Sequence, residues 1–381
     1  MPTSIKREGL TIDDVGRLVR RTVLNPYLTL PIAAAIAWFE KHPEHYRDLH
    51  LHKLIDPSKL ADIGRYLTGI GVAGATLAAN DQLTHLFANN FTSPGHGEWD
   101  WDKEIVLVTG GSSGIGQNVV QGLLERNPRT TVVIVDYAPL SWTPPTGAKI
   151  HYYQADLTKS DLIRSIAARV REEVGHPTVL INSAGTARGS TIMEGSYGDV
   201  ESTLRTNLTA PFLLTKEFLP EMVRNNHGHI VNMCSISAYI PPPYIGDYAA
   251  SKAGLQMLHE SLQLELKHVH KAKRVRLTLA IPSFIQTPLL GGSHPGQNNF
   301  IFPLLHVRTV SEEIVDSLYS GYGRTIYLPG IMRYLASLRG GPEWVLRMVK
   351  EPTYKIALNF AGRQVVDVDE SGGIKLEDRE A

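Results

Sequence analysis

The segment of residues 105–116 limits the possible folds more than any other part of this 381-residue chain. Residues 105–108 are apolar and mostly β-branched, as expected of a parallel strand that is buried on both faces. A glycine-rich turn follows, and residues 117–125 have the apolar side of a helix. This order places backbone N–H groups and the positive end of a helix where a phosphate group could bind. A tight turn without a ligand would show the same glycines, so both interpretations stay open on this segment alone.

The composition narrows the range of partners. Lys and Arg together number 38, as do Asp and Glu, so the chain has no net charge that would attract nucleic acid. The single cysteine, Cys234, excludes an internal disulfide and fits a reducing compartment. No metal site is expected, because the clustered histidines lack both a cysteine and a regular helical spacing, which favours a polar connector: His42, His45, His50 and His52.

Residues 1–98 are expected to form a helical extension outside the main core. Two uncharged runs stand out there, residues 26–39 and 66–80, and each is shorter than the roughly 20 residues that span a bilayer as a straight helix. Arginines precede the first run, and Tyr27 and Trp38 lie near its ends, which favours attachment at a membrane surface. A helical extension packed on the protein itself remains the alternative.

Residues 99–330 alternate between apolar strands and amphipathic helices. This alternation predicts an α/β fold, a doubly wound (Rossmann) parallel sheet with helical N-terminal and C-terminal extensions. Ligands of such sheets bind at the carboxyl ends of the strands. Five features of the sequence fall at expected strand ends: Gly110, Asp136, Asp156, Asn182 and Ser235.

Asp136 is the feature that bears on the cofactor. It ends the second expected strand, 20 residues beyond Gly116, where a dinucleotide fold places the carboxylate that accepts the hydroxyls of the adenosine ribose. A carboxylate would repel a 2′-phosphate, and no arginine follows at once, so NAD(H) is favoured over NADP(H). Asp156 could hold the adenine amino group. A solvated acid at a strand end is the other interpretation of Asp136.

The residue types needed for proton transfer follow the fifth expected strand. Tyr248 and Lys252 are four positions apart and therefore share one face of a helix. A phenol with a pKa of about 10 is a weak base at neutral pH. A neighbouring ammonium, together with an oxidised nicotinamide, is expected to lower that pKa. Ser235, 13 residues before Tyr248, offers a hydroxyl that could hold the reacting oxygen.

With these motifs the chain resembles the short-chain dehydrogenase/reductase family, in its ordinary-length branch, over residues 102–330. The motif T-G-x-x-x-G-x-G matches residues 109–116, and the catalytic tetrad of the family matches Asn207, Ser235, Tyr248 and Lys252. Two positions differ from the family pattern, namely Ser183 in N-N-A-G and Ser283 in P-G. The resemblance implies the following cofactor-binding set: Gly110, Ser112, Ser113, Gly114, Ile115, Gly116, Asp136, Asp156, Leu157, Asn182, Ala184, Gly185, Tyr248, Lys252, Ile285 and Thr287.

The segments outside the motifs resemble those of the membrane-associated subgroup that acts on retinoids, steroids and other lipids. Residues 289–305 would form the substrate loop, residues 331–360 an amphipathic helix pair, and the acidic tail from residue 365 is expected to be disordered. The helix pair suits a membrane surface, the mouth of the substrate site or a packed interface.

These observations predict an NAD(H)-dependent oxidoreductase that interconverts a lipophilic alcohol, such as a retinoid, steroid or fatty alcohol, and its carbonyl. The alternatives are an NADPH-dependent carbonyl reductase and a non-catalytic dinucleotide-binding protein of a membrane or lipid droplet. We expect a homodimer, attached to the cytosolic face of the endoplasmic reticulum or a lipid droplet, or else cytoplasmic.

Overall fold

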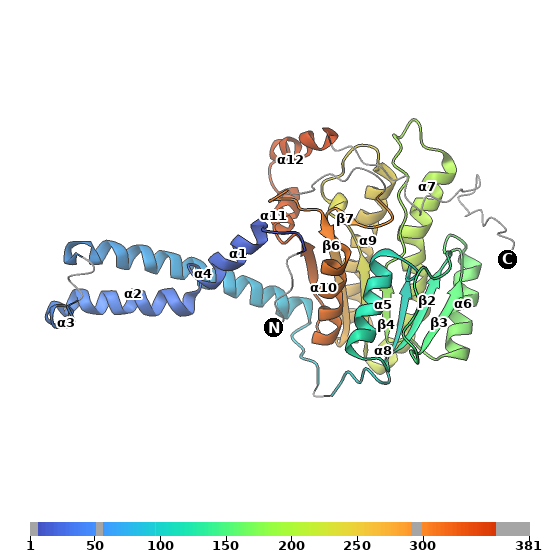
Figure 1. Cartoon of the computed structure of the whole chain (residues 1–381), viewed down its shortest axis with the longest axis horizontal. Helices are drawn as coiled ribbons and strands as arrows, with labels where there is room; N and C mark the ends of the chain where they lie inside the picture. Colours follow the sequence, from blue (N-terminus) through green and yellow to red (C-terminus); the bar gives the residue numbers. More distant parts are fainter. Residues whose placement is uncertain (1–6, 51–55, 96, 291–298, 356–381) are drawn as a thin grey trace. The chain divides into compact units, whose positions relative to one another are not determined.

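The computed structural model describes residues 7–50, 56–95, 97–290 and 299–355. His52, the acidic tail and part of the expected substrate loop lie outside these residues. The chain divides into two compact units (Figure 1), of which one is Leu10–Phe87 and the other contains the remaining described residues. The boundaries of the three expected segments, 1–98, 99–330 and 331–381, therefore stay a prediction, and the two units are described separately below.

The first unit is helical. Its elements are α1 (Ile12–Arg21), α2 (Pro26–Lys41), α3 (Pro43–Asp48), a short 3₁₀ turn (Pro57–Lys59) and α4 (Leu60–Ala88). Both uncharged runs are helical, the first within α2 and the second within α4. Among the described residues no single helix is long and apolar enough to cross a membrane, whereas α1 and α2 together, bent by 44°, meet that criterion.

Helices α2 and α4 run side by side and antiparallel (Figure 1), and glycines of α4 permit their close approach. A Cβ atom on Gly71 would stand 2.5 Å from Leu30 Cδ2, and one on Gly74 would stand 2.2 Å from the carbonyl oxygen of Leu24. Several large apolar side chains of this unit are exposed. Helices α2 and α4 are therefore closely packed against each other and apolar on their outer surface. The exposed set includes Tyr27, Ile32, Trp38, Tyr66, Val72 and Leu83.

Two of the histidines pack around Trp38. The ring centroid of Trp38 lies 4.8 Å from that of His42 and 5.1 Å from that of His45. With Glu44, these histidines bring possible ligand atoms within 4.8 Å of one another. Stacking on the indole and the start of α3 at residue 43 account for this proximity, which the sequence spacing alone does not suggest.

The second unit is built on a sheet of seven parallel strands in the order β3-β2-β1-β4-β5-β6-β9, so the predicted fold class is confirmed. The strands are β1 (Ile105–Thr109), β2 (Thr131–Asp136), β3 (Ile150–Gln154), β4 (Val179–Asn182), β5 (Gly228–Met233), β6 (Val275–Pro282) and β9 (Thr325–Leu328). The chain order reverses between β1 and β4. A crevice for ligands is expected beside that reversal, at the carboxyl ends of the strands.

Helices cover both faces of the sheet (Figure 1). Side chains of α5 (Gly114–Arg126) and α10 (Val307–Ser320) share one apolar core with the strands, and those of α6 (Ser160–Glu173), α8 (Ala210–Asn225) and α9 (Gly246–Leu264) share the other. Neighbouring strand residues alternate between the two cores, as Val106 and Leu107 do, because successive side chains of a strand point to opposite faces. The sheet is therefore buried on both sides, as its apolar strands predicted.

The helical stretch over residues 197–225 contains one irregular turn. It consists of α7 (Tyr197–Leu204), a π-helical turn (Arg205–Thr209) that contains Asn207, and then α8. After β9 the chain forms α11 (Met332–Ser337) and α12 (Glu343–Lys350), in agreement with the expected helix pair. Two short strands, β7 (Ile285–Gln286) and β8 (Leu305–His306), pair with each other beside the main sheet.

Candidate active site

A cavity of about 600 Å³ opens at the carboxyl ends of the strands. At one end its walls are glycine backbone and the ends of β1, β2 and β4. At the other end they are apolar side chains: Ile240, Pro242, Ile245, Phe284, Leu289, Leu290 and Phe302. The same cavity is also lined by Ser235, Tyr248 and Lys252. A polar cradle, reactive side chains and an apolar chamber are thus combined in one space.

The glycine turn after β1 takes its shape from close backbone contacts. Gly110 has a φ of +70°, and a Cβ there would stand 2.8 Å from the Cα of Ala184. A Cβ on Gly116 would stand 2.3 Å from the carbonyl oxygen of Gly110. Only glycine therefore fits at either position without displacing backbone. The turn brings the N-terminus of α5 against the cavity, where Gly114 and Ile115 form the wall.

Asp136 is fixed at the end of β2 and lines the cavity. Its carboxylate accepts hydrogen bonds from the backbone N–H groups of Ser112 (2.9 Å) and Ala138 (3.2 Å). Burial raises the pKa of this carboxyl group, and the backbone hydrogen bonds oppose the rise. The glycine turn and the strand end are thereby joined through one acidic side chain.

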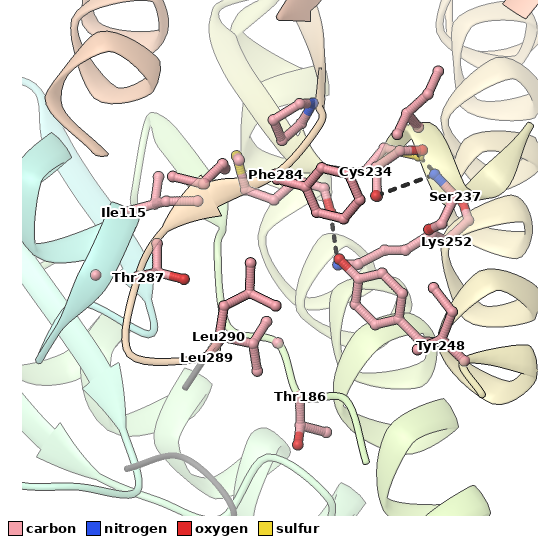
Figure 2. Close-up of a pocket in the computed structure, with 18 of the residues that line it drawn as sticks. Ile115, Thr186, Cys234, Ser237, Tyr248, Lys252, Phe284, Thr287, Leu289 and Leu290 are labelled. Carbon is pink, nitrogen blue, oxygen red and sulfur yellow. Dashed lines mark hydrogen bonds between the residues drawn. The ribbon is translucent and has the colours of Figure 1, made fainter. Parts of the chain in front are cut away.

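The three reactive side chains come from two elements. Ser235 follows β5 and begins the 3₁₀ turn η4 (Ile236–Ala238), and its Oγ accepts a hydrogen bond from the N–H of Ser237 (3.2 Å). Tyr248 and Lys252 lie one turn apart on α9 and face the cavity together (Figure 2). The Nζ atom of Lys252 lies 5.4 Å from the centre of the Tyr248 ring and donates to the carbonyl oxygen of Met233 at 2.8 Å.

Burial dominates the acid–base properties of this pair. It raises the pKa of Tyr248 to about 12, and a hydrogen bond with Ser235 acts in the lowering direction. Burial also lowers the pKa of Lys252 to about 8. Burial thus opposes the lowering of the phenol pKa that was expected from the ammonium of Lys252 together with an oxidised nicotinamide.

Asn207 lies behind the cavity wall and is fully buried. Its Oδ1 accepts from the backbone N–H of Thr186 (2.8 Å), and its Nδ2 donates to the carbonyl oxygen of Thr186 (2.8 Å) and to Ser251 Oγ (3.1 Å). A Cβ on Gly185 would stand 3.4 Å from Asn207 Oδ1 and 3.7 Å from Lys252 Nζ. Both polar groups therefore lie within van der Waals distance of the same position beside Gly185.

Most of the predicted site residues line the cavity, and four do not. The lining set contains Gly110, Ser113, Gly114, Ile115, Gly116, Asp136, Leu157, Ala184, Gly185, Ser235, Tyr248, Lys252, Ile285 and Thr287. Asn207 supports the wall from behind, as described above. The remaining three make hydrogen bonds within the protein: Ser112 with Asp136 and Ala138, Asp156 with Thr158, and Asn182 with Asn232 through its Nδ2 atom.

The structure adds wall residues that the sequence did not single out. Tyr137 directly follows Asp136, and Thr186 directly follows the small-residue exit of β4, so both could have been found as neighbours of predicted residues. Phe284 directly precedes the predicted Ile285 and could have been found in the same way, whereas Ile240 had no such signal, because its position depends on how separate segments meet. Figure 2 shows Phe284, Leu289 and Leu290 around the space that Tyr248 and Lys252 face.

The residues present fit a nicotinamide dinucleotide. The glycine positions leave room that a Cβ would fill, and a helix N-terminus and a buried acid border the same space. The cradle continues without a break to the carboxyl ends of β4 and β5, where the reactive side chains stand.

The comparisons with known proteins agree with this geometry. The family model of the short chain dehydrogenases matches residues 104–298. Dehydrogenase RED2 of Cochliobolus heterostrophus is 39% identical over 216 residues, which cover 57% of this chain and 78% of that protein. Estradiol 17-beta-dehydrogenase 11 of Homo sapiens is 29% identical over 265 residues, 68% of this chain and 84% of that protein.

Among solved structures, a short chain dehydrogenase from Burkholderia cenocepacia in complex with NADP superimposes with a TM-score of 0.55. The match covers 66% of this chain and 99% of that one at 23% identity, and it supports the fold. The segment that the family model matches includes the glycine turn, Asp136 and the three reactive residues Ser235, Tyr248 and Lys252. The protein is therefore an NAD(P)-dependent oxidoreductase of the short-chain dehydrogenase/reductase family, in the subgroup of its steroid and retinol dehydrogenases.

Proposed function

We propose that the protein interconverts a lipophilic alcohol and its carbonyl with NAD(H). The observation that carries the proposal is the position of Ser235, Tyr248 and Lys252, which stand where the glycine cradle meets the apolar chamber. When bound, a nicotinamide dinucleotide supplies the acceptor or donor of hydride. The chain then has to hold the alcohol oxygen, move its proton and exclude water.

Tyr248 is the proposed acid and base. As the phenolate it takes the alcohol proton during oxidation, and as the neutral phenol it returns a proton to the carbonyl oxygen during reduction, while Ser235 holds the same oxygen by a hydrogen bond. Lys252 contributes its positive charge beside the phenol ring and would bind the ribose of the nicotinamide. Asn207 would support a water relay to Lys252, because the two polar groups converge on Gly185. The remaining cofactor-binding residues predicted from the sequence keep those roles in the proposal.

Asp136 supports the choice of NAD(H). Its carboxylate is held at the end of β2 by two backbone N–H groups and lines the cavity, where it would accept the ribose hydroxyls and repel a 2′-phosphate. Titration of the protein with NADH and NADPH tests this role. We expect Asp136→Ala to weaken NADH binding and to leave NADPH binding equal or tighter. Tighter binding of NADPH by the unaltered protein would favour the carbonyl reductase alternative.

The apolar chamber supports a lipophilic substrate. Phe284, Leu289 and Leu290 offer contact area without a charged partner, which suits a retinoid, steroid or fatty alcohol. The relatives named for estradiol agree with this class. A panel of these alcohols, assayed with NAD⁺ and with NADP⁺ by absorbance of the reduced cofactor, identifies the substrate.

Tyr248→Phe tests the mechanism. Loss of the proton-transferring hydroxyl should lower kcat by about 10²-fold or more, whereas NADH binding should be retained. Tyr244→Phe is the matched control, because this tyrosine lies four residues earlier and is 48% exposed. Turnover by Tyr248→Phe at the rate of the unaltered protein would contradict the mechanism. Loss of NADH binding by the same variant would show a folding defect instead.

The helical unit supports a second part of the proposal, attachment to the cytosolic face of a membrane or lipid droplet. Glycine contacts pack α2 on α4, and apolar side chains such as Ile32 and Val72 point outward, an arrangement that suits lipid. We expect the full chain to float with phospholipid vesicles and the Ile32→Glu, Val72→Glu double variant to float less, with unchanged NADH binding. Equal flotation of both proteins would contradict lipid contact through this face.

The third part of the proposal is that the protein forms a homodimer. Phe212 of α8 and Met257 of α9 are 52% and 55% exposed, and burial of such side chains commonly stabilises a subunit interface. Light scattering after gel filtration should give twice the mass of the chain, and Met257→Glu should shift it toward the monomer.

A further inference from the structure

The last described segment of the chain closes the apolar half of the cavity. Met332 and Leu335 of α11 line the cavity, as do Val349 of α12 and residues 352 and 353 of the 3₁₀ turn η7 (Glu351–Lys355). We call α12 and η7 the lid. Helix α11 is anchored by burial, since Met332 is 3% exposed. In contrast, no residue of α12 or η7 is buried, so contacts other than a core must hold the lid in place.

Arg339 provides such a contact. It lies in η6 (Leu338–Gly340), between α11 and the lid, and its Nη1 atom donates a hydrogen bond to the carbonyl oxygen of Ala238. Ala238 is the last residue of the 3₁₀ turn η4. Carbonyl groups at the end of such a turn lack partners within it and carry partial negative charge, which makes a guanidinium a strong partner.

The connection to the lid is otherwise permissive. Gly340 and Gly341 follow Arg339 directly, and no atom lies within 4 Å of the position of a Cβ on Gly340. Glycine allows many backbone conformations, so a lid that loses its contact at Arg339 gains conformational freedom. The hydrogen bond at Ala238 therefore fixes the chain directly before the glycines that lead into the lid.

The 3₁₀ turn η4 connects the contact between Arg339 and Ala238 to Ser235 of the proposed reacting centre. The backbone N–H of Ala238 donates to the carbonyl oxygen of Ser235 (3.1 Å), and the N–H of Ser237 donates to Ser235 Oγ (3.2 Å). Arg339 thus joins the lid to the turn that positions the serine, without lining the cavity itself.

We infer that Arg339 is a positioning residue that fastens the lid over the apolar chamber and thereby sets selectivity for long substrates. Only a substrate that extends beyond Ser235 and Tyr248 reaches Val349 and η7. A short alcohol is held by the reacting centre alone and makes no use of the lid. The selectivity rests on the proposed function, whereas the fastening is a property of the protein itself.

The first experiment measures the fastening without any substrate. Hydrogen–deuterium exchange of peptides from residues 343–355 is compared in the full-length protein and in Arg339→Ala, Arg339→Lys and Arg347→Ala. We expect Arg339→Ala to exchange about tenfold faster, as for the loss of a hydrogen bond to a charged group, and Arg339→Lys to be close to the unaltered protein. Arg347→Ala is the matched control, because this exposed lid cation pairs with Glu343 of the same helix.

The second experiment measures kcat and KM for a long and a short alcohol of the same series. Arg339→Ala should raise KM for the long alcohol about tenfold and change KM for the short alcohol less than about twofold, with NADH binding unchanged. Unchanged exchange in Arg339→Ala would overturn the fastening. Faster exchange with equal effects on both alcohols would overturn the selectivity. If the unaltered protein oxidises no alcohol, the proposed function fails and the exchange result still decides the fastening.

Discussion

Asn207 offers the sharpest test of how the site is supported. Asn207→Ala removes three hydrogen bonds at a fully buried position and leaves the backbone N–H and carbonyl of Thr186, which is 7% exposed, without these partners. Each buried polar group left unpaired costs about 1–3 kcal/mol. Two such groups lead us to expect that the free energy of unfolding falls by roughly 3 kcal/mol, a large share of the roughly 5–15 kcal/mol that stabilises a domain.

The assay is urea unfolding followed by circular dichroism, with two comparison variants. Ser251→Ala removes the 3.1 Å bond to Asn207 Nδ2 and the 2.7 Å bond that Ser251 Oγ donates to the carbonyl oxygen of Tyr248, and it should cost about 1 kcal/mol. Asn207→Asp retains an acceptor for the Thr186 N–H but no donor for its carbonyl, so its cost should fall between the other two. If Asn207→Ala cost no more than Ser251→Ala, the side chain would not be the support of the cavity wall described here.

Three further predictions concern the cradle and the titrating groups. Gly116→Ala places a Cβ 2.3 Å from the carbonyl oxygen of Gly110, so we expect NADH affinity, measured by fluorescence, to fall roughly tenfold or more with unchanged circular dichroism. A hydrogen bond to Glu104 raises the pKa of His227 above 6.5. The protonated His227 therefore stabilises the folded protein fully below pH 6.5, and this stabilisation is lost as the pH rises through the raised pKa. His227→Gln should not show this loss when the free energy of unfolding is measured as a function of pH. Burial lowers the pKa of Lys252 to about 8 from 10.5. Between these pH values the unfolded chain binds a proton at Lys252 that the folded protein does not, so the free energy of unfolding should rise with pH over this range. Lys252→Met should abolish the rise.

The sheet could be predicted from the sequence because its information is local. Most of the parallel strands contain a short apolar run, and the strand expected at residues 105–108 is observed as Ile105–Thr109. The π-helical turn around Asn207 could not be predicted in this way, because Asn207 is hydrogen-bonded to Thr186, a contact 21 residues away. No periodicity within the helix reports such a contact.

The site could be predicted in part. Gly110, Asp136 and Tyr248 were identified because their motifs have fixed spacings, and all line the cavity. The sequence could not show that Ser112 bonds to the protein while Ser113 faces the cavity, since adjacent residues differ only in direction. The sequence left three places open for the helix pair, and the contact of Val349 with the chamber depends on how α12 is placed on the domain.

The packing of Gly110 on Ala184 has a consequence for how the site is made during synthesis. The phosphate cradle begins near residue 110, yet its shape is complete only when β4 has emerged and paired with β1. The reacting side chains require β5 and α9, and the lid follows last, after β9. The cofactor cradle and the acid–base centre are therefore built from segments that emerge at different times during synthesis, and the site is complete only after all of them have emerged.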